Sequence, residues 1–386
     1  MGSGEARILG HDGDRLHGGD TLASASGGTQ SAICYLAIAL TQLGHDVSIV
    51  NATSTPGRHR GVYFPESSIA RSASFLRQQD AIIATGLVGI AMRQAFPRGP
   101  GSPLLICWLQ HAPDQPAVDA FRERAECEAW DGFAFVSLWQ AKGYKAAFAI
   151  DPRRVRIMRN AIAPFFADRP WTSRPLPRDA PTLVYTSTPF RGLELLLDAF
   201  PRMRAQIPAL RLRLFSSMKV YGLSDERYLP LYERARSMPG VEWLGSVDQP
   251  RLAQEMAGAD MLAYPSTFAE TSSIAVMEAM ASGCLVATTD LGALPETLSG
   301  FGETMPAVDE GNRAGAAEAY AALVLGMLQR AIADPARHAS RMSKQVRFAR
   351  EAYSWPRAAK QWADWIAASS GGPQKRSAGQ GKGRVA

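Results

Sequence analysis

The strongest constraint on the fold of this chain is the alternation of short apolar strands with helical segments. Ala81–Ala84 and Leu104–Trp108, for example, have the length and composition of buried strands. Alternation of this kind is typical of α/β folds, because two parallel strands need a crossover connection, usually a helix. The first set of strands is predicted at Arg7–Leu9, Val47–Val50, Ala81–Ala84, Leu104–Trp108, Gly132–Val136 and Arg156–Met158.

A second set of strands follows a proline- and arginine-rich connection at residues 160–181. These strands are predicted at Leu183–Thr186, Leu212–Phe215, Val241–Leu244, Met261–Tyr264 and Leu285–Thr288. We therefore expect two α/β domains with parallel sheets, at residues 1–165 and 166–350. A last helix over residues 351–370 carries an aromatic stripe, which must pack on another part of the protein. The tail, residues 371–386, is rich in glycine, serine and basic residues and is predicted to be disordered.

The composition is that of a soluble globular protein, with 46% hydrophobic and 20% charged residues among 386. No run of about 18 apolar residues occurs, so we expect no membrane-spanning helix. We also expect no signal peptide before the first strand. The four cysteines lack the spacing of a metal or redox site, which favours reduced thiols and a cytoplasmic location.

The net charge of +6 comes largely from the tail. Four basic residues, Lys375, Arg376, Lys382 and Arg384, lie after Ser370, and removing them from the total of +6 leaves +2. A body so close to neutral disfavours nucleic-acid binding. The tail charges leave open a weak contact with anionic lipid.

Two glutamates, Glu270 and Glu278, stand eight residues apart after a predicted strand. Glu278 falls in a short helix, on the face that Ile274 and Met277 mark as inward. A carboxylate on an inward face is costly unless something there needs it. An ionised carboxylate can accept hydrogen bonds from two neighbouring hydroxyls, so a sugar or ribose hydroxyl pair is a good candidate ligand.

The start of the same helix predicts an anion site. Thr271, Ser272 and Ser273 are residue types that cap helix N-termini. Free backbone N–H groups and the helix dipole at such a terminus favour an anion such as a diphosphate. One segment therefore offers hydroxyl acceptors beside a phosphate site, which suits a nucleotide sugar.

This segment closely resembles the signature of retaining glycosyltransferase family four, whose members have the GT-B fold. The matching residues are Pro265-Ser266, Glu270, Glu278-Ala279-Met280-Ala281, Gly283 and Val286-Ala287-Thr288. Family members usually have Gly-Phe-Gly after the first glutamate, where this chain has Thr271-Ser272-Ser273. The resemblance implies two Rossmann-like domains facing a cleft, with the acceptor bound mainly by the first and the donor mainly by the second. It also implies that the last helix packs back on the first domain.

The resemblance adds candidate residues on the first domain. Gly27-Gly28 precedes a predicted helix, and glycine lets the backbone approach a ligand closely. In the family this loop borders the donor and acceptor cleft, although an ordinary turn is the alternative. His111 follows a predicted strand, and a histidine there contacts the transferred sugar in many family members.

On the second domain, Arg191 stands where the family often has a lysine, and a guanidinium can grip the leaving diphosphate with two hydrogen bonds. The family's earlier arginine is missing, and Thr186 or Ser187 takes its place. Lys219 is the candidate for the second positive charge, with a solvated surface lysine as the alternative. Ser187 and Lys219 are accordingly grouped with the donor-binding residues.

Together these features predict a hexosyltransferase that moves a hexose-type sugar from a nucleoside diphosphate sugar to a saccharide or lipid-linked acceptor, in polysaccharide or glycoconjugate synthesis. Glu270, Arg191 and His111 are assigned catalytic roles, and Glu278 is expected to hold the ribose. No metal site is apparent in the sequence, in keeping with a metal-independent reaction that needs no cofactor. Peripheral association with the cytoplasmic membrane stays open. The rival functions are a sugar-nucleotide epimerase of the same fold and a non-catalytic nucleotide-sugar-binding scaffold.

Overall fold

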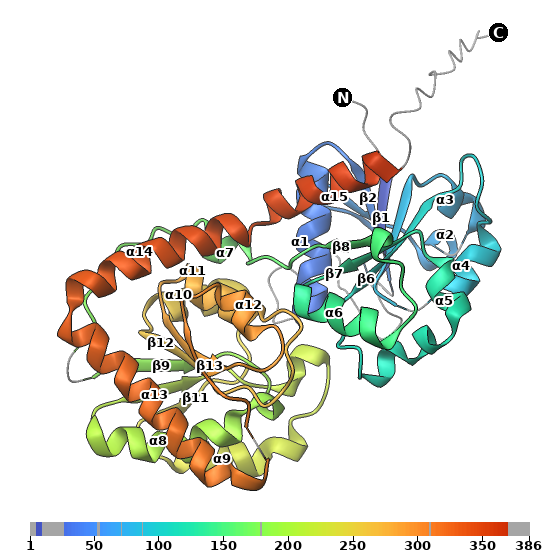
Figure 1. The fold of residues 1–386 in the computed structure, drawn as a ribbon. Helices are drawn as coiled ribbons and strands as arrows, with labels where there is room; N and C mark the ends of the chain where they lie inside the picture. The colour runs from blue at the N-terminus through green and yellow to red at the C-terminus, as the bar shows by residue number, and fades with distance from the viewer. Residues whose placement is uncertain are drawn as a thin grey trace, which may run out of the picture.

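A computed structural model of the chain describes residues 5–9, 27–51, 55–70, 72–86, 88–177, 180–308 and 310–369. The loop around Gly18 and Gly19 and the basic tail after Ser370 lie outside the described residues. The described chain forms two α/β lobes side by side, and two long helices run over the top of both in the view of Figure 1.

The first lobe is built on a sheet in which eight strands are described, in the order β3-β4-β2-β1-β5-β6-β7-β8. All its pairs are parallel except the hairpin of β3 with β4. The strands are β1 (Glu5–Leu9), β2 (Asp46–Val50), β3 (Gly57–His59), β4 (Val62–Phe64), β5 (Ala81–Ala84), β6 (Leu104–Leu109), β7 (Gly132–Phe135) and β8 (Val155–Ile157). The helices of this lobe are α1 (Gly28–Gln42), α2 (Ser67–Ala70), α3 (Ala73–Arg77), α4 (Gly89–Ala95), α5 (Arg124–Ala129) and α6 (Leu138–Ala147).

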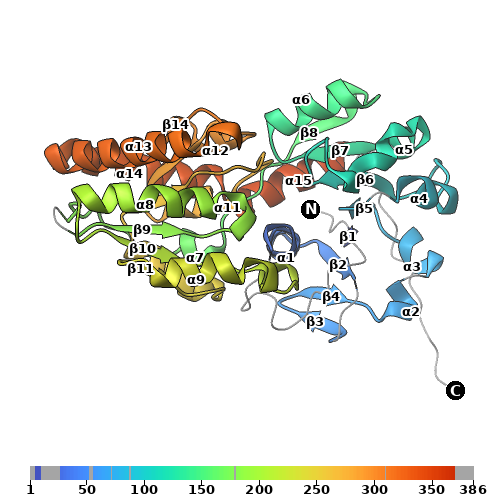
Figure 2. The ribbon, with the colours of Figure 1, turned by 90° about the horizontal axis from the view of Figure 1, so that it is seen from below.

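The second lobe has a wholly parallel sheet in which six strands are described, in the order β11-β10-β9-β12-β13-β14. The strands are β9 (Thr182–Tyr185), β10 (Arg211–Leu214), β11 (Val241–Trp243), β12 (Met261–Tyr264), β13 (Leu285–Thr289) and β14 (Glu303–Met305). Its helices are α8 (Leu193–Gln206), α9 (Leu229–Ser237), α10 (Gln249–Ala257), α11 (Ile274–Ala281), α12 (Leu294–Leu298) and α13 (Arg313–Ala333). Figure 2 shows the sheet of this lobe lying between helices.

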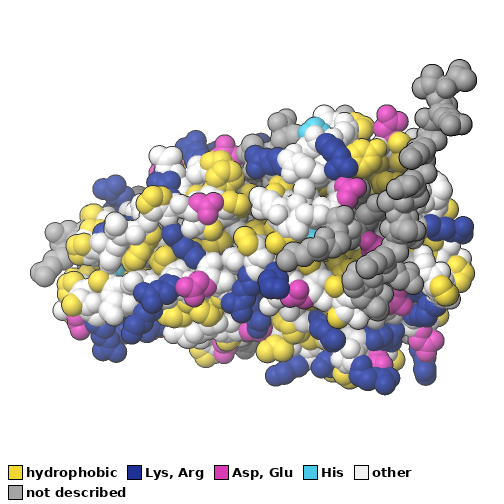
Figure 3. Space-filling model, turned by 90° about the horizontal axis from the view of Figure 1, so that it is seen from above, with side chains coloured by type: hydrophobic (Ala, Val, Ile, Leu, Met, Phe, Trp, Pro, Cys, Tyr) yellow, Lys and Arg dark blue, Asp and Glu magenta, His cyan; other side chains and the backbone are white. Residues whose placement is uncertain are grey.

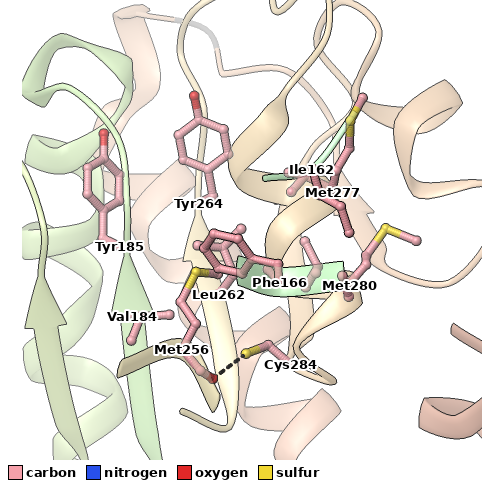
Figure 4. Close-up of a cluster of buried hydrophobic side chains, with 14 of the residues drawn as sticks. Ile162, Phe166, Val184, Tyr185, Met256, Leu262, Tyr264, Met277, Met280 and Cys284 are labelled. Atoms are coloured by element: carbon pink, nitrogen blue, oxygen red, sulfur yellow. Dashed lines mark hydrogen bonds between the residues drawn. The ribbon is translucent and has the colours of Figure 1, made fainter. Parts of the chain in front are cut away.

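The core of the second lobe joins the sheet to the connection between the lobes. Figure 4 shows Val184 and Leu262, from β9 and β12, packed near Phe166 of the short helix α7 (Pro164–Ala167). Met277 of α11 lies beside Ile162 in the same view. These side chains are at most 1% exposed, and complete burial of one of them contributes about 1.5–3 kcal/mol. The connection at residues 160–181 is therefore held partly by the core of the second lobe.

The last two helices tie the lobes together. Helix α14 (Pro335–Ala352) packs on α11 of the second lobe, and α15 (Trp355–Ser369) packs on α1 of the first. The Trp355 ring stacks on Tyr35 with centroids 6.2 Å apart, and Trp362 meets Trp108 edge to face at 5.4 Å. The aromatic stripe of the last helix thus contacts the first lobe.

The predicted strands match the structure with small shifts at their ends. Met261–Tyr264 and Ala81–Ala84 have the predicted bounds, whereas the predicted strand Arg156–Met158 is β8, shifted by one residue. The short strands β3, β4 and β14 were absent from the sequence-based prediction. Each has three residues, which is too short for an apolar pattern to be seen.

Surface charge is mixed on the face that carries α14 and α15. Figure 3 shows this face, with Lys and Arg side chains spread over it and Asp and Glu side chains between them. On the part of this face that is drawn in colour, no continuous stripe of one sign is visible. Within the described residues, no helix combines the length and apolar character needed to cross a bilayer.

Candidate active site

The strand order of the second lobe fixes where a ligand can bind. The chain proceeds from β9 toward β10 on one side and from β12 toward β13 on the other, so the order reverses between β9 and β12. Loops that leave two such strands at their carboxyl ends diverge and open a crevice. Arg191 follows β9 and Glu270 follows β12, so both predicted residues come from loops at this crevice.

A cavity of about 420 Å³ lies at this point and is lined by both lobes. It brings together ten of the predicted site residues: Gly27, Gly28, His111, Ser187, Arg191, Glu270, Thr271, Ser272, Ser273 and Glu278. Lys219 does not line the cavity, and its side chain is exposed. Among the described lining residues, Arg191 is the single lysine or arginine.

Glu270 and Arg191 form an ion pair inside the cavity. Arg191 Nη1 donates to Glu270 Oε1 at 2.6 Å, and the Tyr264 hydroxyl donates to the same carboxylate oxygen. The side chains of Glu270 and Arg191 are only 5% and 20% exposed. The sequence interpretation gave these two residues separate ligands, whereas the structure shows that each is also the partner of the other.

The charge of Arg191 is secured by its surroundings. Burial by itself would lower the pKa of Arg191, but the Glu270 carboxylate and the phenols of Tyr264 and Tyr221 outweigh burial and raise the pKa above its ordinary value. The guanidinium also lies over the Phe268 ring, 4.6 Å from its centroid. Its Nε is buried and has no hydrogen-bond partner among the described residues, so one donor is left for a ligand.

The backbone holds Glu270 in place. Residues Glu270 and Gly292 form an isolated parallel bridge, and the Ala293 N–H donates to the Glu270 carbonyl at 2.7 Å. Gly292 has φ of +68°, and a Cβ there would lie 2.5 Å from the Glu270 carbonyl oxygen. Glycine is required at this position because a side chain would push the glutamate loop away from the cavity.

Glu278 lines the cavity from α11 and is 4% exposed. Burial raises the pKa of Glu278 to about 8, and the hydrogen bond from the Ala163 backbone N–H opposes that rise. Ile274 lines the cavity with it, as their i, i+4 spacing predicts, but Met277 packs in the core beside Ile162 instead. The supposed inward face is therefore split, because the helix is buried on the core side as well as on the ligand side.

The start of α11 opens into the cavity. Ser273 is the N-cap residue of this helix, but its side chain makes no capping hydrogen bond. Ser272 Oγ is buried and has no hydrogen-bond partner among the described residues. The Thr271 hydroxyl donates to the Gln110 carbonyl of the first lobe at 2.8 Å. This terminus thus offers N–H groups and one unused hydroxyl to an anion, while Thr271 fastens it to the opposite lobe.

The first lobe lines the cavity with neutral amides and one imidazole, from Gln110, Asn160 and His111. Gln110 and Asn160 exchange hydrogen bonds through their side-chain amides, with Asn160 Nδ2 donating to Gln110 Oε1 at 3.0 Å. The carbonyl of His111 accepts from Gln140 Nε2 and from the Tyr144 hydroxyl. These bonds fix the backbone at His111 so that the residue stays at the cavity.

Sequence reasoning missed several lining residues, among them Tyr35, Gln110, Asn160, Tyr221 and Tyr264. Tyr264 ends a predicted strand and precedes Pro265-Ser266, so its place after β12 was a usable signal. Tyr221 lies in a short 3₁₀ turn after β10, and no sequence pattern marks it. In the described part of the chain, no three His, Cys, Asp or Glu side chains gather in a way that could hold a metal ion.

Comparison with known proteins gives the family of the second lobe. Residues 180–325, which include both glutamates and Arg191, match the profile of the family described as "Glycosyl transferases group 1". Over these residues the chain is similar to the group 1 glycosyltransferases. A phosphatidyl-myo-inositol mannosyltransferase of Mycolicibacterium smegmatis is 29% identical over 186 residues, which cover 47% of this chain and 44% of the relative. The match thus spans less than half the length of this curated relative.

Solved structures give the same fold over almost the whole chain. A sucrose-phosphate synthase from Thermosynechococcus elongatus superposes with a TM-score of 0.64 at 18% identity, covering 94% of this chain and 98% of that one. The Anabaena protein HepE in complex with UDP-glucose gives a TM-score of 0.67 at 14% identity, covering 94% and 99%. The group 1 relationship and these neighbours show that the fold is GT-B, as predicted.

Proposed function

We propose that the protein is a retaining glycosyltransferase that moves a hexose-type sugar from a nucleoside diphosphate sugar to an acceptor. The observation that carries this proposal is the cavity at the β9/β12 crevice, where Arg191, Glu270, Glu278 and the start of α11 meet. The relationship to group 1 glycosyltransferases supports it.

The donor would lie mainly on the second lobe. Glu278 would accept hydrogen bonds from the ribose hydroxyls, and the N–H groups at Ser272 and Ser273 would bind the diphosphate. Negative charge builds on the departing diphosphate as the sugar passes through an oxocarbenium-like state. Arg191, already oriented by Glu270, would stabilise that charge through its guanidinium. Glu270 and His111 would position the hydroxyls of the transferred sugar.

The acceptor would lie mainly against the first lobe, beside Gln110, His111 and Asn160. The curated relatives are phosphatidyl-myo-inositol mannosyltransferases, which supports a lipid-linked or polyol acceptor and a peripheral association with the cytoplasmic membrane. We propose no enzyme nucleophile, because the acceptor would attack from the side of the leaving group. The reaction would be independent of metal and cofactor.

Thermal unfolding with UDP, GDP and ADP tests the donor assignment first. A nucleotide present at a hundred times its dissociation constant adds about 2.7 kcal/mol to the free energy of unfolding. The nucleotide that stabilises the protein identifies the base of the donor, and hexose donors with that base are then supplied with candidate acceptors. The anomeric configuration of the product shows whether the reaction is retaining. If none of the three nucleotides raises the melting temperature, the proposed donor class is wrong.

Product analysis with the donor alone separates the two rival functions. An epimerase would convert the nucleotide sugar without any acceptor, and a scaffold would bind it without turnover. A transferase leaves most of the donor intact until an acceptor is added.

A further inference from the structure

Tyr221 lies where the two lobes meet at the mouth of the cavity. Its hydroxyl accepts a hydrogen bond from Arg191 Nη2 at 3.2 Å, although the residue belongs to a surface turn and is 40% exposed. Arg191 is thus held at both ends of its guanidinium, by Glu270 through Nη1 and by Tyr221 through Nη2.

The other side of the Tyr221 ring touches Gly27 of the first lobe. A Cβ built at Gly27 would lie 2.8 Å from Cε1 and 3.0 Å from Cδ1 of that ring. Real Cβ atoms do not approach a ring carbon so closely, so any larger residue at position 27 would push the ring or the lobe away. The Gly27 conformation has φ of −64°, which every residue can adopt. Glycine at position 27 is therefore explained by the close approach of the Tyr221 ring and not by backbone conformation.

The turn that carries Tyr221 is held firmly within the second lobe. Asp225 accepts from the Met218 N–H and from the Ser217 hydroxyl, both at 2.6 Å. Gly222 ends the turn with φ of +69°, and its N–H donates to the Lys219 carbonyl at 2.9 Å. Since the turn is anchored on its own lobe, the contact with Gly27 depends on where the first lobe sits.

Other contacts also join the two lobes in this structure. The Glu296 carboxylate of α12 accepts from the N–H groups of Leu138 and Trp139 at the start of α6. It also pairs with Arg159 at 2.6 Å. None of these residues touches Arg191 directly. Thr271, next to Glu270, reaches the first lobe through the Gln110 carbonyl, but among the described partners of Arg191 it is Tyr221 that itself lies against the first lobe.

We propose that Tyr221 is a positioning residue that orients Arg191 only when the lobes are closed. With the lobes apart, the turn stays in place, but the Tyr221 side chain loses its support on Gly27 and becomes free to rotate away from Nη2. Closure seats the ring on Gly27 and fixes Arg191 for the leaving diphosphate. The inference rests on the proposed function, because it takes Arg191 to act on that group.

Four variants test the inference: Gly27→Ala, Tyr221→Ala, Tyr221→Phe and the double variant Gly27→Ala/Tyr221→Ala. Gly27→Ala should lower kcat/KM by about tenfold or more, because misplacement by a fraction of an ångström is costly in an oriented site. The double variant lacks the ring that the new methyl group meets. Its kcat/KM should therefore stay within about threefold of that of Tyr221→Ala alone. If the two losses multiply instead, the ring and Gly27 act independently and the inference is wrong.

Tyr221→Phe separates orientation from mere packing. It keeps the ring on Gly27 but removes the acceptor for Arg191, so kcat should fall by about threefold or more while KM for the donor stays nearly constant. A variant with unchanged kcat would show that the hydroxyl does not orient Arg191, which also overturns the inference.

Small-angle scattering gives a readout that does not depend on turnover. Gly27→Ala should enlarge the radius of gyration, and the double variant should restore the wild-type value. A wild-type protein that binds no nucleotide would instead disprove the proposed function, whatever the scattering shows. A wild-type protein that transfers sugar, combined with losses of kcat/KM that multiply in the double variant, would disprove only the role of Tyr221.

Discussion

The two walls of the cavity use different chemistry. The wall from the second lobe holds the ion pair of Arg191 with Glu270 and, close by, the buried Glu278. The wall from the first lobe holds two glycines, an amide pair between Gln110 and Asn160, and one imidazole. Fixed charges are thus gathered on the side proposed for the donor diphosphate. The side proposed for the acceptor offers shape and neutral hydrogen bonds.

This contrast explains how charge is kept on side chains that are largely buried at the cavity. A buried charge is tolerated when it has a partner and satisfied hydrogen bonds. Glu270 has Arg191 and Tyr264, and Arg191 has Glu270 and Tyr221. Among the described residues Glu278 has the Ala163 backbone N–H as its partner, and burial raises its pKa to about 8. Most of the predictions below substitute a residue of one wall and measure whether the substrate proposed for the other wall is affected.

The largest effect is expected for Arg191→Ala. Loss of the guanidinium removes the charge that would stabilise the departing diphosphate, so kcat should fall by about 10²- to 10³-fold. The change also leaves the Glu270 carboxylate buried without its partner, which should lower the free energy of unfolding by about 3 kcal/mol. Steady-state kinetics and urea unfolding measure the two effects.

Arg174→Ala is the matched control for that variant. Arg174 pairs with Asp260 at 2.8 Å, and the Asp260 side chain is 2% exposed, but neither residue lines the cavity. Its loss should also lower stability while leaving kcat within about twofold of the wild type, because it breaks a similar pair at a distance. Equal losses of kcat in both variants would mean that stability, and not the charge at Arg191, limits activity.

The next largest effect is expected for Glu278→Gln, seen as a change in pH dependence. Ribose hydroxyls bind the ionised carboxylate better than the neutral acid, so nucleotide binding must remove a proton below the pKa of about 8. Nucleotide affinity should rise by up to about tenfold per pH unit as the pH approaches that pKa from below. Calorimetry across this range should give a sloped profile for the wild type and a flat, weaker one for Glu278→Gln. A sloped profile in the variant would assign the proton to another group.

Glu278→Gln should weaken nucleotide binding but increase the stability of the nucleotide-free protein. The pKa of Glu278 is higher in the folded protein than the ordinary glutamate value of 4.5. The folded state therefore holds its proton more tightly, and the stabilisation present below that ordinary value is lost as pH rises toward about 8. Glu278→Gln has no such proton to lose. Without nucleotide, its melting temperature should therefore rise relative to that of the wild type between these two pH values.

The two walls also differ in how far the sequence could predict them. The wall from the second lobe comes largely from one continuous segment, because β12, the Glu270 loop and α11 follow one another. Residue types and spacing were therefore enough to predict it. The pairing of Glu270 with Arg191 was missed because it depends on how the β9 and β12 loops converge. Gln110 and Asn160 were missed because neutral amides carry no cost that marks them in a sequence. The contact of Gly27 with Tyr221 joins two lobes, and no local pattern records it.

A smaller effect, confined to the acceptor, is expected for Gln110→Ala. The side-chain amide would be lost, whereas the Gln110 carbonyl that accepts from Thr271 is backbone and remains. KM for the acceptor should rise by about tenfold, since one or two hydrogen bonds to a half-buried amide are removed. Nucleotide affinity should stay as in the wild type. Equal losses of nucleotide and acceptor binding would show that the walls do not divide the two substrates.

The smallest effect is expected for Lys219→Ala, although the sequence made Lys219 a candidate for the second phosphate-binding charge. Its side chain is exposed and does not line the cavity, while Arg191 within it keeps one donor, Nε, without a described partner. The charge of a solvated lysine outside the cavity is screened by salt, so nucleotide affinity should change by less than about twofold. Titration at low and at physiological salt checks this expectation. A loss as large as that of Arg191→Ala would mean that the lysine swings into the cavity when the donor binds, and the described wall would then be incomplete.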